Sequence, residues 1–295
     1  DAAAGRGGRM YGQTTTRPIN ALFSFNSYLP FDKLPSWQAL RALPRDAQLA
    51  QLRDPATRAR LVAEEADMKA RDGVFQGGGA ATTDPRRPDY DNLYALLGVD
   101  WDDPTVGELS RETGKHPVEV MIDLALDNGF NQMFVQPLVN EDPDDVLGML
   151  RHDRTLATFS DSGAHVCQEM GSSLQTHMLS YWVRKTGTFT LEQAVRMLSY
   201  DNALAWDMTD RGLIKEGLAA DIVVFDEDRV APQLPTVEAD LPGGARRLVQ
   251  KATGIEYTVV NGETTLIKGE TTGATPGVLV QGPGVAGPLV SHADE

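Results

Sequence analysis

The chain of 295 residues is long enough for one large domain or two ordinary ones, and its 41% hydrophobic and 23% charged residues are typical of a folded protein. Its net charge of −15, without any cluster of lysine and arginine, argues against nucleic-acid binding, because such a surface repels phosphate backbones. It contains no apolar run of roughly 18 residues, so no membrane association by a transmembrane helix is expected.

The two chain features that bear on location are the cysteine count and the N-terminus. A single cysteine, Cys167, excludes an internal disulfide framework and favours a reducing, cytoplasmic location. The N-terminus has no apolar signal-peptide core and does not begin with methionine. We expect either that an upstream segment was removed or that the chain starts partway through a longer product.

The N-terminal part is predicted to begin with a short strand over GRMYGQTT, residues 8–15, followed by an irregular stretch over residues 17–31. Pro18 and Pro30 limit helix formation in that stretch. Its aromatic side chains could form a lid over an acyl chain, but we favour a packed core. These aromatic residues are Phe23, Phe25, Tyr28 and Phe31.

Helices are predicted between residues 34 and 70, where apolar residues recur every three or four positions and Pro44 and Pro55 stand at expected helix starts. A loop is predicted over residues 77–89, because glycine, proline and threonine dominate its composition.

From residue 105 the predicted elements are a helix capped by Thr105, a helix starting at Pro117, a strand over residues 133–139 and a helix over 142–152. The segment from residue 155 to 165 then predicts a buried strand that runs into a polar loop. Alternation of helices and strands is typical of a (β/α) barrel, in which the chemistry lies at the carboxyl ends of the strands.

The character of the sequence changes near residue 211. A helix pair is predicted over residues 190–208, whereas residues 212–295 alternate apolar and polar positions between turns and end in a Gly/Pro-rich tail. The sequence VNGE at residues 260–263 predicts a tight hairpin. We therefore divide the chain into an α/β part, residues 1–211, and a β-rich part, and no internal repeat is visible.

The most informative stretch is TFSDSGAHVCQEMG, where Asp161 follows an apolar strand and precedes the small pair Ser162 and Gly163. A carboxylate beside a metal-bound water can take a proton from that water and pass it to a leaving amine. Asp-Ser-Gly is also common in turns, so Asp161 could simply cap a helix or anchor a turn.

Other polar residues near the predicted strands have two possible roles. Arg17 could bind a substrate carboxylate with its guanidinium, or it could be a surface arginine beneath the aromatic stretch. His165 could reach the pocket, or it could lie in a surface loop. Cys167 is expected to be passive, because no cationic cluster surrounds it in the sequence. Structural roles are expected for His116, His152 and His177.

Several separate blocks of the sequence resemble the amidohydrolase superfamily, and within it the N-acyl-D-amino-acid deacylase (D-aminoacylase) branch. The blocks are SDSGAHV with the following LEQAVRMLSYDNALAW and GLAADIVVFD, then PFDKLPSWQALRALP, GKHPVEVMIDLAL and YTVVNGETTLIKGETTGATPG. They occur in the order that is typical of the branch and cover roughly residues 8–280. The resemblance implies that this chain is the C-terminal part of a TIM-like (β/α)8 barrel: its last two strands, a helical insertion over about residues 30–105, and strands of a small β-sandwich.

By this resemblance, Asp161 ends the eighth barrel strand and acts as general base and acid, and as a metal ligand in some members. The seventh strand would contain MYGQTT, and Tyr11 would line the pocket. Members often carry an aromatic run there, from which Tyr11-Gly12-Gln13 departs. Ser162, Gly163, His165 and Arg17 are the further candidates for substrate binding.

The histidine ligands that the superfamily uses for zinc are absent from this sequence, whose five histidines include no His-X-His pair. Because a catalytic zinc needs about three protein ligands, the resemblance implies that most ligands lie on the N-terminal half of the same enzyme or on a partner subunit, and that the assembly is oligomeric. The implied reaction is hydrolysis of a small-molecule linear amide such as an N-acyl-D-amino acid. The alternatives are a cyclic imide or dipeptide substrate, or a non-catalytic structural subunit with an amidohydrolase scaffold.

Overall fold

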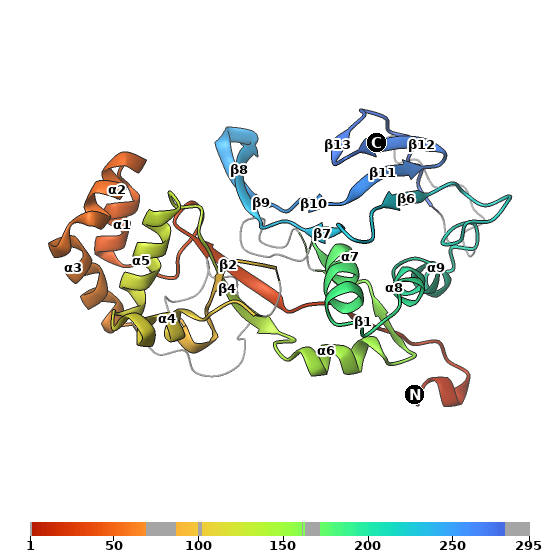
Figure 1. Cartoon of the computed structure of the whole chain (residues 1–295), viewed down its shortest axis with the longest axis horizontal. Helices are drawn as coiled ribbons and strands as arrows, with labels where there is room; N and C mark the ends of the chain where they lie inside the picture. The colour runs from red at the N-terminus through yellow and green to blue at the C-terminus, as the bar shows by residue number, and fades with distance from the viewer. Residues whose placement is uncertain (1, 69–86, 100–101, 161, 163–171, 281–295) are drawn as a thin grey trace, which may run out of the picture.

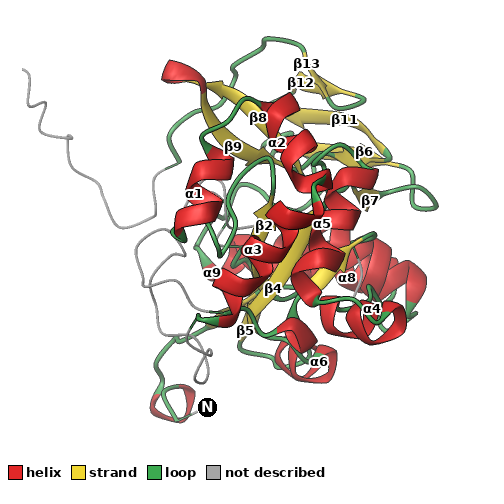
Figure 2. Ribbon diagram, turned by 90° about the vertical axis from the view of Figure 1, so that its left-hand side faces the viewer, coloured by secondary structure: helices red, strands yellow, loops and turns green. Residues whose placement is uncertain are grey.

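The computed structural model describes residues 2–68, 87–99, 102–160, 162 and 172–280. It contains both helices and strands, as the sequence predicted, with α1–α5 gathered at one end of the molecule and α8 and α9 toward the other (Figure 1). Figure 2 shows the C-terminal strands at one end of a perpendicular view, with α6 at the opposite end. None of the helices in the described ranges has the length and apolar character needed to cross a membrane.

Two short strands, β1 (Gly12–Thr14) and β5 (Thr155–Ala157), pair in parallel, with Gly12 opposite Thr155 and Thr14 opposite Ala157. Both strands were predicted, but each is shorter than its sequence pattern indicated. Among the described residues this is the only parallel pair, and the other sheets are antiparallel. A 3-10 turn, η1 (Ala4–Arg6), precedes β1.

Three strands that come between β1 and β5 in the sequence form an antiparallel sheet in the order β2-β4-β3. They are β2 (Ile19–Ser24), β3 (Tyr94–Leu96) and β4 (Met133–Val139). Strand β4 confirms a prediction, whereas the prediction of an irregular stretch across β2 is wrong. All six residues of β2 are buried, because α-helices cover one face of the sheet and a hairpin covers the other. A strand buried on both faces lacks the alternation that identifies a strand in a sequence.

Five helices belong to the same region, and their starts follow the predicted signals. The Thr105 hydroxyl accepts a hydrogen bond from the Glu108 backbone N–H at 3.0 Å, while the Glu108 carboxylate accepts one from the Thr105 N–H at 2.8 Å. Asp54 caps the helix that Pro55 begins. The helices are α1 (Pro35–Arg41), α2 (Arg45–Arg53), α3 (Pro55–Ala66), α4 (Val106–Thr113) and α5 (Pro117–Asp127), with a 3-10 turn at η2 (Tyr90–Asn92).

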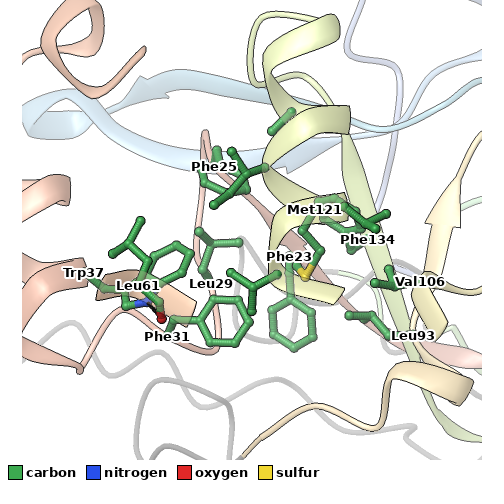
Figure 3. Close-up of a cluster of buried hydrophobic side chains, with 14 of the residues drawn as sticks. Phe23, Phe25, Leu29, Phe31, Trp37, Leu61, Leu93, Val106, Met121 and Phe134 are labelled. Atoms are coloured by element: carbon green, nitrogen blue, oxygen red, sulfur yellow. Dashed lines mark hydrogen bonds between the residues drawn. The ribbon is translucent and has the colours of Figure 1, made fainter. Parts of the chain in front are cut away.

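The aromatic residues of the N-terminal stretch form the core of this region, as we expected (Figure 3). The rings of Phe31 and Trp37 lie 4.6 Å apart between centroids, and those of Phe25 and Phe130 lie 5.4 Å apart. Phe23 packs in the same cluster. Since each large aromatic side chain removes a large apolar area from water, these rings help to hold the helices on the sheet.

The remaining helices form a second hydrophobic cluster around β5, with Val146, Ala157, Met178, Trp182 and Ala194 at its centre. The helix pair α8 and α9 confirms the sequence prediction, and so does α6. These helices are α6 (Pro143–Leu150), α7 (Leu174–His177), the π-helix η3 (Met178–Lys185), α8 (Leu191–Leu198) and α9 (Tyr200–Ala205).

The C-terminal strands form a sheet in the order β13-β12-β11-β6 and two smaller pairs, β7 with β10 and β8 with β9. The predicted hairpin is confirmed: Asn261 and Gly262 have φ values of 47° and 83° between β11 and β12. The strands are β6 (Ile222–Phe225), β7 (Ala231–Pro232), β8 (Thr236–Leu241), β9 (Ala245–Val249), β10 (Ala252–Thr253), β11 (Ile255–Val260), β12 (Glu263–Ile267) and β13 (Glu270–Thr271), with the turn η4 (Pro242–Gly244). Val237 and Leu248 of the β8–β9 hairpin pack on the face of the β2-β4-β3 sheet opposite the helices.

Candidate active site

The carboxyl ends of β1 and β5 meet at one edge, because the two strands run in parallel. The backbone N–H groups of Thr158 and Phe159 both donate to the Thr14 carbonyl oxygen, at 3.2 and 3.1 Å. The segments that follow β1 and β5 therefore begin side by side. In barrels of parallel strands this is the edge that carries the chemistry, so the residues that follow each strand are the candidates for a site.

Arg17 follows β1 by three residues and is buried, with 5% of its surface exposed. Its Nη1 atom donates to the Ser173 hydroxyl oxygen at 2.9 Å. The two residues before it, Thr15 and Thr16, are also buried. Burying a charged group without hydrogen-bonding partners is costly. The fold therefore provides the buried Arg17 guanidinium with a hydrogen-bond acceptor at this edge, the Ser173 hydroxyl. The alternative of a surface arginine is therefore wrong.

One wall beside Arg17 is formed by α7 and the π-helix η3. The Thr16 hydroxyl donates to the Leu174 carbonyl oxygen at 2.9 Å, and the Trp182 indole N–H donates to the Thr16 carbonyl oxygen at 2.8 Å. Segments of π-helix are rare and occur frequently at functional sites. Sequence reasoning missed Ser173 and Trp182, because neither belongs to a motif and Trp182 fits an ordinary apolar helix pattern.

His177 lies in this wall, fully buried, with its ring stacked on Tyr181 at 5.1 Å between centroids. Burial lowers the pKa of His177 well below its usual value, and the nearby positive charge of Arg17 lowers that pKa further. The imidazole is therefore uncharged at neutral pH. We predicted a structural role for His177, and its burial is consistent with one, but the sequence did not show that it borders Arg17.

Three of the predicted site residues, Asp161, Gly163 and His165, lie outside the described residues, as does Cys167. Ser162 is exposed, and its backbone N–H donates to the Ser160 hydroxyl at 3.2 Å.

Tyr11 does not join Arg17. It immediately precedes β1 and so lies at the amino end of the strand, whereas Arg17 follows the carboxyl end. Tyr11 is 38% exposed.

The described part of the chain contains no group of three histidine, cysteine, aspartate or glutamate side chains that could hold a metal ion. Two of its histidines have local structural roles: the Nδ1 atom of His116 accepts from the Val118 N–H at 3.3 Å at the start of α5, and that of His152 accepts from the Arg154 N–H at 3.1 Å. These residues do not fit a zinc site by themselves, because such sites need several converging donors.

The sequence matches the Amidohydrolase family over residues 32–266, which is most of the chain, and the protein belongs to this family. The predicted family is thereby confirmed. Among individual relatives, the chain is 27% identical over 241 residues to the N-acyl-D-aspartate deacylase of Alcaligenes xylosoxydans xylosoxydans. That match covers 81% of this chain but only 41% of the relative, so this chain spans less than half of the relative's length.

Two solved structures are also similar. A D-aminoacylase shares 24% identity and a TM-score of 0.37, and the match covers 58% of this chain and 33% of that protein. The N-acyl-D-glutamate deacylase of Bordetella bronchiseptica, solved with zinc and a phosphonate inhibitor, shares 16% identity and a TM-score of 0.40, with 90% and 41% coverage. Because both TM-scores are low, the family assignment rests on the sequence match.

Proposed function

We propose that this chain forms part of an enzyme that hydrolyses a linear amide, specifically an N-acyl-D-amino acid, to a carboxylic acid and a free amino acid. The observation that carries the proposal is the buried Arg17 at the edge where β1 and β5 end together. An N-acyl amino acid carries one carboxylate and one amide. A guanidinium at this edge supplies a partner for the carboxylate, and the relatives that match this chain are named as deacylases of such compounds.

Asp161 is the residue that we propose handles the proton. It stands four positions beyond Ala157, the last residue of β5, whose carboxyl end adjoins Thr14. Its carboxylate would take a proton from the attacking water and give that proton to the departing amine nitrogen as the carbon–nitrogen bond breaks. Ser162, Gly163 and His165 belong to the same loop of the sequence and would line the site beside it.

The metal ligands are proposed to lie elsewhere. In our proposal the N-terminal half of the enzyme, or a partner subunit, supplies the histidines for zinc, with Asp161 as at most one further donor. The described residues of this chain do not gather a ligand set of their own.

The test of the proposed function is Asp161→Asn in the full-length enzyme. The amide keeps the shape of the carboxylate and loses its basicity, so kcat for an N-acetyl-D-amino acid should fall by about 10²–10⁴-fold. Asp240→Asn is the matched control, because Asp240 is exposed on β8 and pairs with Arg247 at 2.7 Å, and this variant should keep the wild-type kcat. Unchanged turnover in Asp161→Asn would assign Asp161 to a turn. A full-length protein without any amidase activity would favour the structural-subunit alternative.

A further inference from the structure

We propose that Ser173 is a positioning residue that orients Arg17 to bind the substrate's carboxylate. This inference rests on the proposed function, because it assumes that Arg17 contacts a substrate carboxylate. Ser173 comes immediately before α7, is 2% exposed, and accepts a hydrogen bond from Arg17 Nη1 at 2.9 Å. It lies 156 positions from Arg17 in the sequence, so only the fold brings the two together.

The backbone of Ser173 is fixed by the first turn of α7. Its carbonyl oxygen accepts from the His177 backbone N–H at 2.8 Å and from the Thr176 hydroxyl at 3.2 Å. The backbone that carries the Ser173 hydroxyl is therefore held in place. A partner that is itself held in place can restrict the guanidinium to one orientation, which a mobile surface serine could not do.

The backbone of the Arg17 segment is held by the same helices. Thr16, its neighbour, donates to the Leu174 carbonyl and accepts from the Trp182 indole. Arg17 is thus anchored at both ends, through the backbone beside it and through a nitrogen at the tip of its side chain. Of these contacts, the hydrogen bond that Arg17 donates to Ser173 is the one that acts directly on the guanidinium, so its loss should affect carboxylate binding most.

The chemistry of the wall agrees with this role. The imidazole of His177 is uncharged and a serine hydroxyl carries no charge either, so neither group neutralises the guanidinium. A hydroxyl can orient a guanidinium without neutralising it, whereas a carboxylate in the same place would remove much of its attraction for an anionic substrate.

The experiment compares two substrates in the full-length enzyme: an N-acetyl-D-amino acid and the uncharged amide of the same compound. Ser173→Ala should raise KM for the acid by about tenfold with kcat little changed, as expected when a hydrogen bond to a charged binding group is lost. Its KM for the uncharged amide should stay at the wild-type value. Ser173→Thr keeps the hydroxyl and should restore most of the affinity for the acid.

Ser180→Ala is the matched control. Ser180 is a buried serine in η3, on the same helical wall, and within the described residues its hydroxyl has no hydrogen-bond partner. A general loss of stability would change both substrates alike in either variant, so the ratio of the two KM values separates positioning from folding.

The Arg17→Met variant distinguishes a failure of the role proposed for Ser173 from a failure of carboxylate binding by Arg17. A rise in KM for the acid in Arg17→Met, together with an unchanged ratio in Ser173→Ala, would overturn the role of Ser173 and leave the proposed function intact. An unchanged ratio in both variants would overturn carboxylate binding by Arg17, and with it the role of Ser173. A selective rise in both variants, with Ser180→Ala unchanged, supports the inference.

Discussion

At the scale of single residues, His177 links the site to the stability of the protein. Its imidazole stays neutral inside the wall formed by α7 and η3, because burial and the charge of Arg17 both disfavour the protonated form. In the unfolded chain the same imidazole gains a proton below about pH 6.5. The unfolded state therefore binds more protons than the folded state in mildly acidic solution, and stability must fall as the pH falls.

We expect the free energy of unfolding to decrease between about pH 6.5 and pH 5, with His177 contributing up to about 1.4 kcal/mol per pH unit. His177→Phe keeps a ring next to Tyr181 and removes the titrating group, so its stability should change less over this window. Urea unfolding at a series of pH values measures the slope. Equal slopes in wild type and His177→Phe would contradict the prediction.

The sequence predicted some residues of the candidate site and not others, for a physical reason. Arg17 could be proposed because it follows a predicted strand directly, and chemistry gathers at strand ends. Ser173 and Trp182 could not be proposed, because they meet residues 16 and 17 only through contacts across more than half the chain. Tyr11 was expected to line the pocket, but β1 begins only at Gly12, so Tyr11 precedes the amino end of that strand.

At the scale of secondary-structure elements, helix α4 contains a glycine that its packing requires. A Cβ atom on Gly107 would lie 2.9 Å from the carbonyl oxygen of Tyr90 in the turn η2, and would also meet the side chain of Asp91. Gly148, in α6, is exposed, and a Cβ there would meet nothing within 4 Å. The same substitution by alanine can therefore be compared at a crowded helical position, Gly107, and at an open one, Gly148.

Gly107→Ala should destabilise the protein by about 1–3 kcal/mol, because the clash exceeds the gain in helix propensity. Gly148→Ala should stabilise it by about 0.5–1 kcal/mol, because alanine favours a helix over glycine where space is free. Chemical denaturation of both variants gives the comparison. Stabilisation of both by a similar amount would show that α4 can move away from η2 at little cost.

Helices were predicted better than strands in this protein. Capping residues and prolines are local signals, and they marked the starts of α3, α4 and α5 correctly. Strand β2 was missed because its partners, β4 and the covering hairpin β8–β9, are far away in the sequence and bury both of its faces. The Asn261-Gly262 turn was found because its positive φ angles favour these two residue types.

At the scale of the whole molecule, the C-terminal sheet exposes apolar side chains in a row. Pairing places Val224 and Ile267 on either side of Tyr257, and the three are 45%, 44% and 43% exposed. The chain also spans only 41% of the N-acyl-D-aspartate deacylase that it matches. Both facts support our proposal that the active assembly includes the N-terminal half of the enzyme or a partner subunit, since large exposed apolar groups often mark an interface.

We expect the isolated chain to bind zinc weakly, because tight zinc sites need several converging nitrogen or sulfur donors. Adding the polypeptide that carries the N-terminal half should create tightly held zinc and amidase activity together. Metal content measured by mass spectrometry, for the chain alone and for the mixture, checks this expectation. As a control, the N-terminal polypeptide mixed with the Asp161→Asn chain should gain zinc but little activity. Stoichiometric, tightly held zinc on the isolated chain would refute the proposal.

The parallel pairing of β1 with β5 has a consequence for the order in which the protein folds. About 140 residues separate the two strands, and closing a flexible loop of that length is entropically costly and slow. The antiparallel pairing of β2 with β4 brings Ile19 opposite Val139 and so closes most of this loop. Once β2 and β4 have paired, only about 20 residues remain free between β1 and β5, which lowers the entropic cost of bringing β1 and β5 together by about 2 kcal/mol. On a ribosome, β1 therefore cannot pair with β5 until the whole intervening segment has been synthesised.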